Sequence, residues 1–355
     1  MAGQLTIKQI AQLAGVSVGT VDRVLHNRGR VSSKAEAAIR AVLDNNQYRQ
    51  NLHTSAVAFK KTGKSIRLVV AIPFSKKGEY WDMIQSGVRK GLTEYADIPI
   101  DCHFAFFDPF NSLSCRQVFE KILGEPCSAV LISPIFVEET RAFCGQLEKR
   151  GVPFGFVDGR IDGINPCSSH MADQFSCGRL MARMTDAFTP PDAEVAIFLP
   201  KRVGTLMSNN SLVRTKSFRD YYACIHPQRV LKEGFYSPDD PEKIKTEVSA
   251  FLQENPGVKG IAVMISTGYL ISDALREIGR TDVCVGGYDI TEGNARCVRE
   301  NTLTFVIDQH PVRQGFSGVE ALLHYLMYGR LEEEHKSNSP VDVVFKENID
   351  TFPVI

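Results

Sequence analysis

The sequence predicts a small all-α helix-turn-helix head followed by an α/β core of two doubly wound lobes. Three observations predict this organisation. The first fifty residues carry short amphipathic helical patterns separated by capping residues and glycine. From residue 66 onward, short apolar runs alternate with helical stretches, and this alternation occurs in two successive series. The chain has 355 residues, which is more than one ordinary domain needs.

The first helix of the head is predicted from its boundaries and its apolar face. Thr6 and Gln9 have the spacing of a capping box, in which each side chain satisfies a backbone amide at the helix start. Apolar residues then recur at i, i+3, i+4 and i+7 over residues 7–14, which is the pattern of one helix face. Gly15 is expected to end the helix, because a helix exit often requires positive φ.

A second short helix follows at once, and a third lies beyond it. Ser17 can cap the second helix. The apolar positions expected to face inward are Val18, Val21, Val24 and Leu25. Ser33 and Glu36 have the spacing of another capping box before the third helix. Two short helices joined by a tight, glycine-containing turn form the unit that lays its second helix in the major groove of DNA. A three-helix bundle that binds no nucleic acid is the alternative.

The distribution of charge favours the DNA-binding interpretation. Residues 1–64 contain ten basic and three acidic residues, a net charge of +7. Since the whole chain has 41 basic and 41 acidic residues, the remainder carries −7. A neutral protein therefore concentrates positive charge in one terminal module, which is typical of a part that binds phosphates.

Residues 6–48 resemble the DNA-binding head of the LacI/GalR family of transcriptional regulators. The run AGVSVGTVDRVLHN carries the resemblance, because it follows the family pattern AGVS-x-x-TV-x-RVL-x-N. The resemblance implies an operator DNA partner, a homodimer that reads a pseudo-palindrome, and a small effector. It also implies that bases are read by Val18, Gly19 and Arg23, and that phosphates are contacted by Thr6, Ser17, Thr20 and Arg30. Arg23 can pair bidentately with guanine.

Residues 51–65 form the expected hinge between the head (residues 1–50) and the core (residues 66–355). Residues 51–59 have a helical pattern that is too short to form a stable helix in isolation. By resemblance this segment is the family's hinge helix, and Val57 stands where the family usually has the leucine that enters the minor groove. A plain flexible tether is the alternative.

The pattern of the core predicts parallel sheets with helices on both faces. The first series of strand-length runs comprises IRLVVAIPF, IDCHFAFF, AVLISPIF and VPFGFVDG. The second comprises EVAIFLP, RVLKEGFYS, VKGIAVMIS and TDVCVGGYD. Helical stretches separate the runs, as in doubly wound folds, whose binding crevice lies at the carboxyl ends of the strands. The core resembles the periplasmic-binding-protein type I-like core of the same family.

Prolines mark three expected crossings between the lobes. TPPDA (residues 189–193), DQHP (308–311) and SNSPV (337–341) each place proline between two elements. These segments resemble the three crossovers of the family's core. The expected lobes are an N-terminal lobe of residues 66–188 and 311–338 and a C-terminal lobe of residues 194–308 and 339–355.

Candidate effector contacts in the first lobe lie at strand ends and helix starts. Tyr80 and Trp81 open the first core helix, where sugar-binding relatives carry adjacent aromatic residues that stack on a sugar face. Asp158 ends the fourth run and matches an aspartate that binds hydroxyls in those relatives. Asp173 lies in a run like the family's D-x-x-x-G-x-x-L-A. The structural alternatives are core packing for Trp81, a turn for Asp158 and a helix N-cap for Asp173.

Four further candidates lie in the second series. Arg214 lies near the family's R-x-x-G-[FW] element, although Ser217 replaces the glycine. The guanidinium of an arginine can donate two parallel hydrogen bonds to a pair of hydroxyl or carboxylate oxygens. Asp289 matches the family's G-[YF]-D strand end, and Gln309 matches its I-x-Q-x-P segment. Ser266 opens a Ser-Thr pair where the family usually has Asn-Asp, so the resemblance does not transfer a specific sugar.

Other functional classes lack their signatures in this sequence. The nine cysteines occur without a CxxC pair, which predicts neither a zinc site nor a redox dithiol. No HExxH or Walker motif occurs, and no strand precedes a GxGxxG. The sequence GVSVG at residues 15–19 has the GxSxG spacing but lies between two predicted helices, whereas the catalytic motif follows a strand. We therefore expect no enzyme, no cofactor and no metal. No apolar run is long enough to span a bilayer. No signal peptide precedes the first helix, so we expect a cytoplasmic protein with reduced thiols.

These features predict a ligand-responsive DNA-binding transcription regulator, a repressor, that senses a sugar or sugar derivative. No leucine heptad supports a tetramerisation helix, so a homodimer is expected. The alternative is a solute-binding protein of a sugar transporter or chemoreceptor system, which shares the core fold but needs export and has no use for a basic head.

Overall fold

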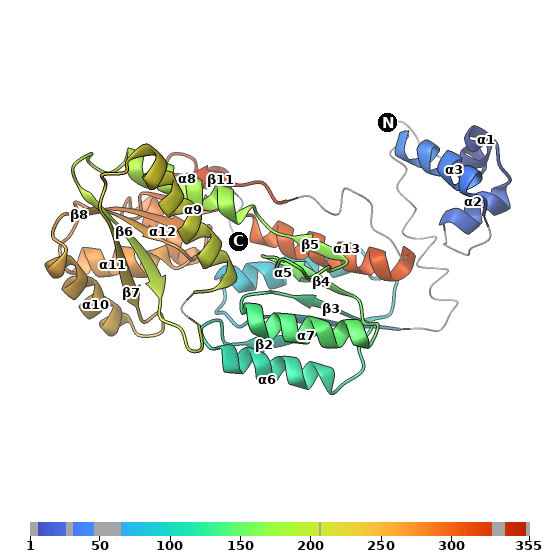
Figure 1. Ribbon diagram of the computed structural model, residues 1–355, viewed down its shortest axis with the longest axis horizontal. Coiled ribbons are helices and arrows are strands. Elements are labelled where there is room, and N and C mark those ends of the chain that lie inside the picture. The colour runs from blue at the N-terminus through green and yellow to red at the C-terminus, as the bar shows by residue number, and fades with distance from the viewer. Residues whose placement is uncertain (1–5, 26–30, 46–64, 206, 329–337, 353–355) are drawn as a thin grey trace.

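The computed structural model describes residues 6–25, 31–45, 65–205, 207–328 and 338–352 (Figure 1). It contains a helical head and an α/β core of two lobes, as the sequence predicts. Arg30, Val57 and residues 51–64 of the expected hinge lie outside the described residues, so their roles in DNA binding stay predictions.

The head consists of α1 (Ile7–Ala14), α2 (Val18–Leu25) and α3 (Ser33–Asn45). The predicted capping box is present. The Gln9 amide donates to Thr6 Oγ1, and the Thr6 amide donates to Gln9 Oε1 at 2.8 Å. Gly15 ends α1 with a φ of 64°, as its position predicts. The buried core of the head contains Ile10, Ala11, Val21 and Ile39.

Two details of the head differ from the sequence prediction. Ser32 rather than Ser33 caps α3, since its Oγ accepts a hydrogen bond from the Ala35 amide at 3.3 Å. Glu36 lies one position too far along to complete a box with Ser32, and its carboxylate pairs with Arg40 instead. Val18 is 46% exposed, whereas Val21 is buried in the core of the head and Val24 packs against that core, as predicted.

The first lobe is a parallel sheet with helices on both faces (Figure 1). Its strands run in the order β2-β1-β3-β4-β5. They are β1 (Ile66–Pro73), β2 (Ile100–Phe107), β3 (Ala129–Ile132), β4 (Phe154–Val157) and β5 (Ser168–His170). The helices are α5 (Tyr80–Thr93) and α13 (Pro311–Tyr328) on one face and α6 (Ser112–Leu123) and α7 (Val137–Lys149) on the other.

The central strand β1 contributes side chains to an apolar core on each face of the first sheet. Leu68, Val70 and Ile72 pack with residues of α5 and α13. Val69 and Ala71 pack with residues of α6 and α7. Because successive side chains of a strand point to opposite faces, a strand covered on both sides is apolar throughout.

The second lobe contains a sheet in the order β11-β10-β9-β8-β6-β7, parallel except for β11. Its strands are β6 (Glu194–Pro200), β7 (Leu231–Tyr236), β8 (Val258–Val263), β9 (Cys284–Tyr288), β10 (Phe305–Asp308) and β11 (Asp342–Val344). α8 (Gln174–Ala187) and α9 (Asn209–Ile225) cover one face. α10 (Pro241–Glu254), α11 (Gly268–Glu277) and α12 (Glu292–Arg299) cover the other.

The first crossing between the lobes lies earlier than the sequence suggested. In α8, Cys177 and Met181 belong to an apolar core that also contains Val195 and Ile197 of β6. α8 therefore belongs to the second lobe, and the chain crosses just before it, near residues 171–173, rather than at 189–193. The prolines at 190 and 191 mark only the end of α8, because an amphipathic pattern does not reveal which of two sheets a helix covers.

The other two crossings flank α13. The chain leaves β10 in the second lobe, forms α13 on the first sheet, and returns to pair β11 with β10. Ala172 and Ser339 form an isolated parallel bridge, so the first and third crossings lie side by side. His310 Nε2 lies 2.8 Å from Asp342 Oδ2, which joins the second crossing to the third.

Candidate functional site

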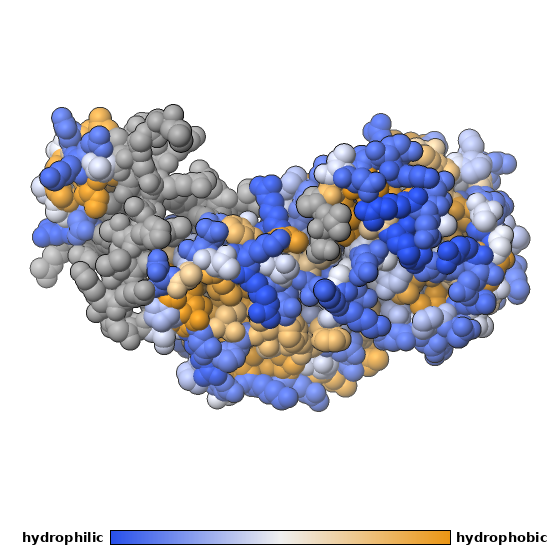
Figure 2. Space-filling view, turned by 180° about the vertical axis from the view of Figure 1, so that it is seen from behind, coloured by the Kyte–Doolittle hydropathy of each residue, from blue (hydrophilic) through white to orange (hydrophobic). Residues whose placement is uncertain are grey.

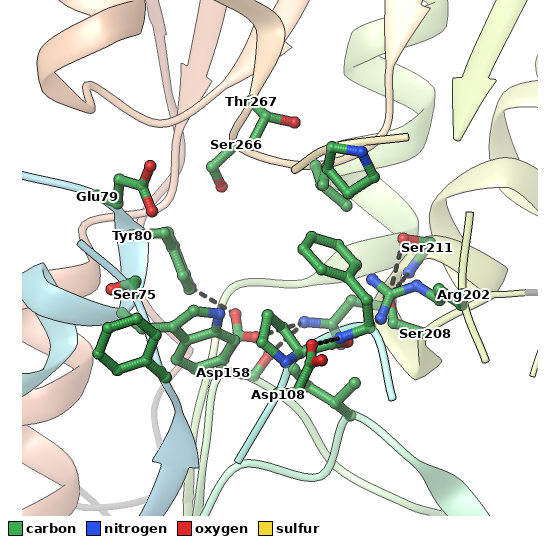
Figure 3. Close-up of a pocket in the computed structure, with 18 of the residues that line it drawn as sticks. Ser75, Glu79, Tyr80, Asp108, Asp158, Arg202, Ser208, Ser211, Ser266 and Thr267 are labelled. Atoms are coloured by element: carbon green, nitrogen blue, oxygen red, sulfur yellow. Dashed lines mark hydrogen bonds between the residues drawn. The ribbon is translucent and has the colours of Figure 1, made fainter. Parts of the chain in front are cut away.

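A cavity of about 800 Å³ lies between the two lobes (Figure 3). Its walls come from residues that follow the carboxyl ends of strands in both sheets: Phe74 after β1, Asp158 after β4 and Ser266 after β8. Loop ends of this kind are where doubly wound sheets bind ligands. The cavity is therefore the candidate effector site.

Asp158 receives hydrogen bonds from both lobes. The Tyr80 hydroxyl donates to its Oδ1, and Figure 3 shows these two side chains directed toward each other. From the second lobe, Asn210 Nδ2 donates to the Asp158 carbonyl at 2.7 Å and to Oδ2 at 3.0 Å. Asp158 has a φ of 70°, a strained conformation for a residue with a side chain. Burial raises the pKa of its carboxyl to about 7, although Arg214 and the Tyr80 hydrogen bond oppose this shift.

Arg214 of α9 is buried and held by three hydrogen bonds. Nε donates to Gln174 Oε1 at 2.6 Å, Nη1 to the Met264 carbonyl at 2.9 Å, and Nη2 to Gln309 Oε1 at 2.6 Å. Its Cζ lies 4.0 Å from the centroid of the Tyr288 ring. A guanidinium carries five N–H donors, so Arg214 keeps donor capacity for a ligand in the cavity that it lines.

Asp289 supports the cavity wall from behind. It is fully buried and has a φ of 63°. Its carboxylate accepts from the Gln309 amide at 3.1 Å, from Gln309 Nε2 at 2.9 Å and from Ser266 Oγ at 2.5 Å. Burial raises the pKa of this carboxyl to about 7. Asp289 thus orients two side chains that line the cavity without lining it itself.

Most of the effector residues predicted from the sequence come together here. The lining includes Tyr80, Trp81, Asp158, Arg214, Ser266 and Gln309. Asp289 stands behind them, and Asp173 is absent from the lining. The Asp173 carboxylate instead accepts from the amides of Phe175 and Ser176, both at 3.3 Å, as the N-cap of α8. Asp173 therefore acts as a helix N-cap, the alternative to effector binding, because the first amides of a helix need acceptors.

The sequence analysis missed several aromatic and charged residues that line the cleft. Phe74, Phe106 and Phe110 line the cavity from the first lobe, and Asp108 and Arg202 join them from opposite lobes. The phenylalanine-rich run FAFFDPF, residues 104–110, could have indicated these lining residues, since it continues past the end of β2 toward the loops that bind ligands. Asn210 left no comparable signal, because its contact with Asp158 depends on the approach of the two lobes.

In the head, the predicted base-reading residues Val18, Gly19 and Arg23 are all exposed. Ser17 Oγ accepts from the Thr20 amide at 3.1 Å, and the two hydroxyls lie 2.8 Å apart. These hydroxyls therefore lie at the N-terminus of α2, where a helix can also meet a phosphate. Thr6 occupies the corresponding position in α1.

The groups that line the cleft are hydrogen-bonding side chains and aromatic rings, which is a chemistry suited to holding a polar ligand. Within the described residues, no group of three or more His, Cys, Asp or Glu could hold a metal ion. None of the helices that the structure describes has both the length and the apolar character needed to cross a bilayer.

Comparison with known families assigns both parts of the chain. Residues 6–51 match "Bacterial regulatory proteins, lacI family", and residues 68–330 match "Periplasmic binding protein domain". The regulator GalR of Escherichia coli is 28% identical over 127 residues, covering 36% of this chain and 35% of GalR. The regulator DegA of Bacillus subtilis is 40% identical over 57 residues, 16% of this chain and 17% of DegA. These matches span about a third or less of the curated relatives.

Solved structures show the same fold over most of the chain. A putative LacI transcriptional regulator from Bacteroides fragilis is 28% identical with a TM-score of 0.77, covering 82% of this chain and 100% of that one. GanP, a glucose-galactose binding protein from Geobacillus stearothermophilus, has a TM-score of 0.69 at 16% identity, covering 80% and 99%. The chain therefore belongs to the periplasmic binding protein domain family over residues 68–330, and its head, residues 6–51, is similar to the lacI family of bacterial regulatory proteins.

Proposed function

We propose that this protein is a sequence-specific DNA-binding transcription regulator, a repressor, whose operator affinity responds to a sugar or sugar derivative. The observation that carries the proposal is the presence, in one chain, of a helix-turn-helix head and a two-lobed cleft lined from both sides. The head supplies exposed base-reading positions, and the cleft supplies a separate ligand site. A regulator of this kind acts in the cytoplasm, where its DNA is.

The chemistry of the cleft supports a polyhydroxylated effector. Asp158 offers a carboxylate, Arg214 offers guanidinium donors, and Gln309 and Ser266 lie beside them. Sugar hydroxyls both donate and accept hydrogen bonds, and an aromatic residue such as Trp81 can stack on the apolar face of the ring. Because the lining comes from both lobes, a bound ligand favours one relative position of the lobes over others.

A homodimer is part of the proposal, since a two-fold protein reads a two-fold site. In this mechanism the hinge at residues 51–65 folds on the operator and Val57 enters the minor groove, where an apolar wedge kinks the duplex. A ligand that moves the lobes changes the separation of the two hinges. The coupling is reciprocal, so the operator must change effector affinity by the factor by which effector changes operator affinity.

DNA binding is tested first with Arg23→Ala. On an operator selected from random duplexes, the variant should bind about 5- to 150-fold more weakly than the original protein, because one bidentate guanine contact contributes roughly 1–3 kcal/mol. Binding to a random duplex of equal length should change much less. Fluorescence anisotropy at one fixed salt concentration measures both affinities.

Arg40→Ala is the matched control, because Arg40 lies on α3 and pairs with Glu36. It should lower both affinities equally or not at all. Equal losses on operator and random DNA for Arg23→Ala would make Arg23 a phosphate contact only. A protein that binds sugar but no duplex would instead fit the solute-binding alternative.

A further inference from the structure

The lining of the cavity changes in chemistry along the first sheet, whose strand order is β2-β1-β3-β4-β5, because Phe106 lies in β2 and Phe74 follows β1, whereas Asp158 follows β4. We call Asp158, Arg214, Ser266 and Gln309 the polar end, and Phe74, Phe106 and Phe110 the aromatic end. The polar end offers enough donors and acceptors for one hydroxylated ring. The volume of about 800 Å³ lies in the upper part of the range of about 300–1,000 Å³ that holds drug-sized ligands. One six-membered ring with its hydroxyls fills only part of that space.

The aromatic end presents uncovered ring surface to the cavity. Phe74 is 61% exposed and Phe106 is 41% exposed, although both line the cavity. Their rings meet edge to face with centroids 6.3 Å apart. Apolar surface left in water is unfavourable, and a ligand ring that covers it removes this cost. The C–H face of a sugar is a suitable cover, because it can stack on an aromatic ring.

Phe110 is held in place by both lobes. Its amide donates to Asp108 Oδ1 at 2.8 Å, and its carbonyl accepts from the Val203 amide of the second lobe at 2.7 Å. Arg202 places its Cζ 5.2 Å from the centroid of the Phe110 ring and donates to the Pro109 carbonyl. Phe110 is therefore preorganised by residues of both lobes, and the charged residues Asp108 and Arg202, which Figure 3 labels, line the same cavity.

We propose that the aromatic end is a second sugar subsite and that the effector is a glycan of at least two rings rather than a monosaccharide. This inference rests on the proposed sugar-sensing function. One ring bonds to the polar end. The next ring lays its C–H face on the aromatic end, and its hydroxyls meet Asp108 and Arg202.

Isothermal titration calorimetry of the full chain tests the proposal with neutral monosaccharides and with the di- and trisaccharides built from them. We expect one di- or trisaccharide to bind at least about 10-fold more tightly than its constituent monosaccharides. Phe74→Ala should weaken that ligand by about 2- to 10-fold, the contribution of one aromatic contact. The affinity for the monosaccharide should stay unchanged.

Phe175→Ala is the matched control, because Phe175 is also exposed, at 46%, but lies at the start of α8 outside the cavity lining. It should change neither affinity. Since Phe74 is largely exposed, its removal should leave the thermal unfolding midpoint near that of the original protein, which the same samples show.

Two outcomes overturn the inference in distinguishable ways. If the monosaccharide binds as tightly as the longer glycan, or if Phe74→Ala weakens both equally, there is no second subsite and sugar sensing stands. If no sugar of any length binds or raises the thermal midpoint, the sugar-sensing function itself fails, and the subsite fails with it.

Discussion

At the scale of the residue, Asp158 links the cleft to pH. An aspartate in an unfolded chain has a pKa of about 3.9, whereas burial raises the pKa of Asp158 in the folded protein to about 7. The folded state therefore binds this proton more tightly than the unfolded state does. Its contribution to stability is fully present below about pH 4 and is lost as the pH rises through about 7.

We expect the free energy of unfolding of the ligand-free protein to fall as the pH rises from about 5 to 8. Asp158→Asn removes the titrating group while keeping an acceptor for Tyr80, so its stability should fall less steeply. The pH-dependent loss of unfolding free energy should be larger in the original protein than in Asp158→Asn, by at most about 1.4 kcal/mol for each unit of pKa shift. Urea unfolding at several pH values measures it. Asp162→Asn, at a side chain that is 97% exposed, serves as the control. Parallel curves for all three proteins would show that Asp158 is ionised throughout.

At the scale of the element, α8 and α9 pack closely enough to require glycine at position 178. A Cβ there would lie 2.0 Å from Ser217 Oγ and 2.3 Å from the Arg214 carbonyl. We expect Gly178→Ala to lower the free energy of unfolding by roughly 1–3 kcal/mol, because one of the helices must move. The shift would also displace Arg214 and weaken effector binding.

Gly145→Ala on α7 is the matched control for Gly178→Ala. A Cβ at Gly145 meets no atom within 4 Å. This substitution should be neutral or stabilise the fold by about 0.4–1 kcal/mol, because alanine restricts the unfolded chain. Chemical denaturation measures both variants. Equal changes in unfolding free energy at the two positions would mean that α8 and α9 can move apart without loss of stability.

The same elements show what the sequence could and could not predict. The apolar runs of β1 and β6 predict buried parallel strands, since covering a sheet on both faces leaves no polar positions. The strand-end residues Asp158 and Gln309 follow from that fold. The sequence does not predict that α8 belongs to the second lobe or that Asn210 contacts Asp158. Both features depend on packing between segments that are far apart in the chain, and such packing leaves no local sequence pattern.

At the scale of the whole molecule, the edge of the first sheet supports the homodimer. β2 is an edge strand of eight residues, and its Phe104 is only partly buried, with the Arg89 guanidinium 4.8 Å from the ring centroid. Figure 2 shows an apolar area on this lobe. Long apolar edge strands are normally covered. A second copy of the chain is the cover that the proposed homodimer supplies.

We expect Phe104→Glu to shift the protein from dimer to monomer, since a carboxylate at a contact between copies loses its water. Sedimentation velocity measures the change. Phe175→Glu, at an exposed position on α8, should leave the dimer intact. Circular dichroism shows whether each variant is folded. A folded Phe104→Glu protein that remains a dimer would place the interface elsewhere.

The path of the chain through the lobes has a consequence for synthesis. α13 completes the helical cover of the first lobe, and β11 completes the sheet edge of the second, yet both come after β10 in the chain. A nascent chain that has already emerged through β10 therefore has two unfinished lobes rather than one finished and one missing. α13 and β11 are therefore needed to complete both lobes, so we expect a chain that stalls before α13 to carry a helical head and two incomplete lobes.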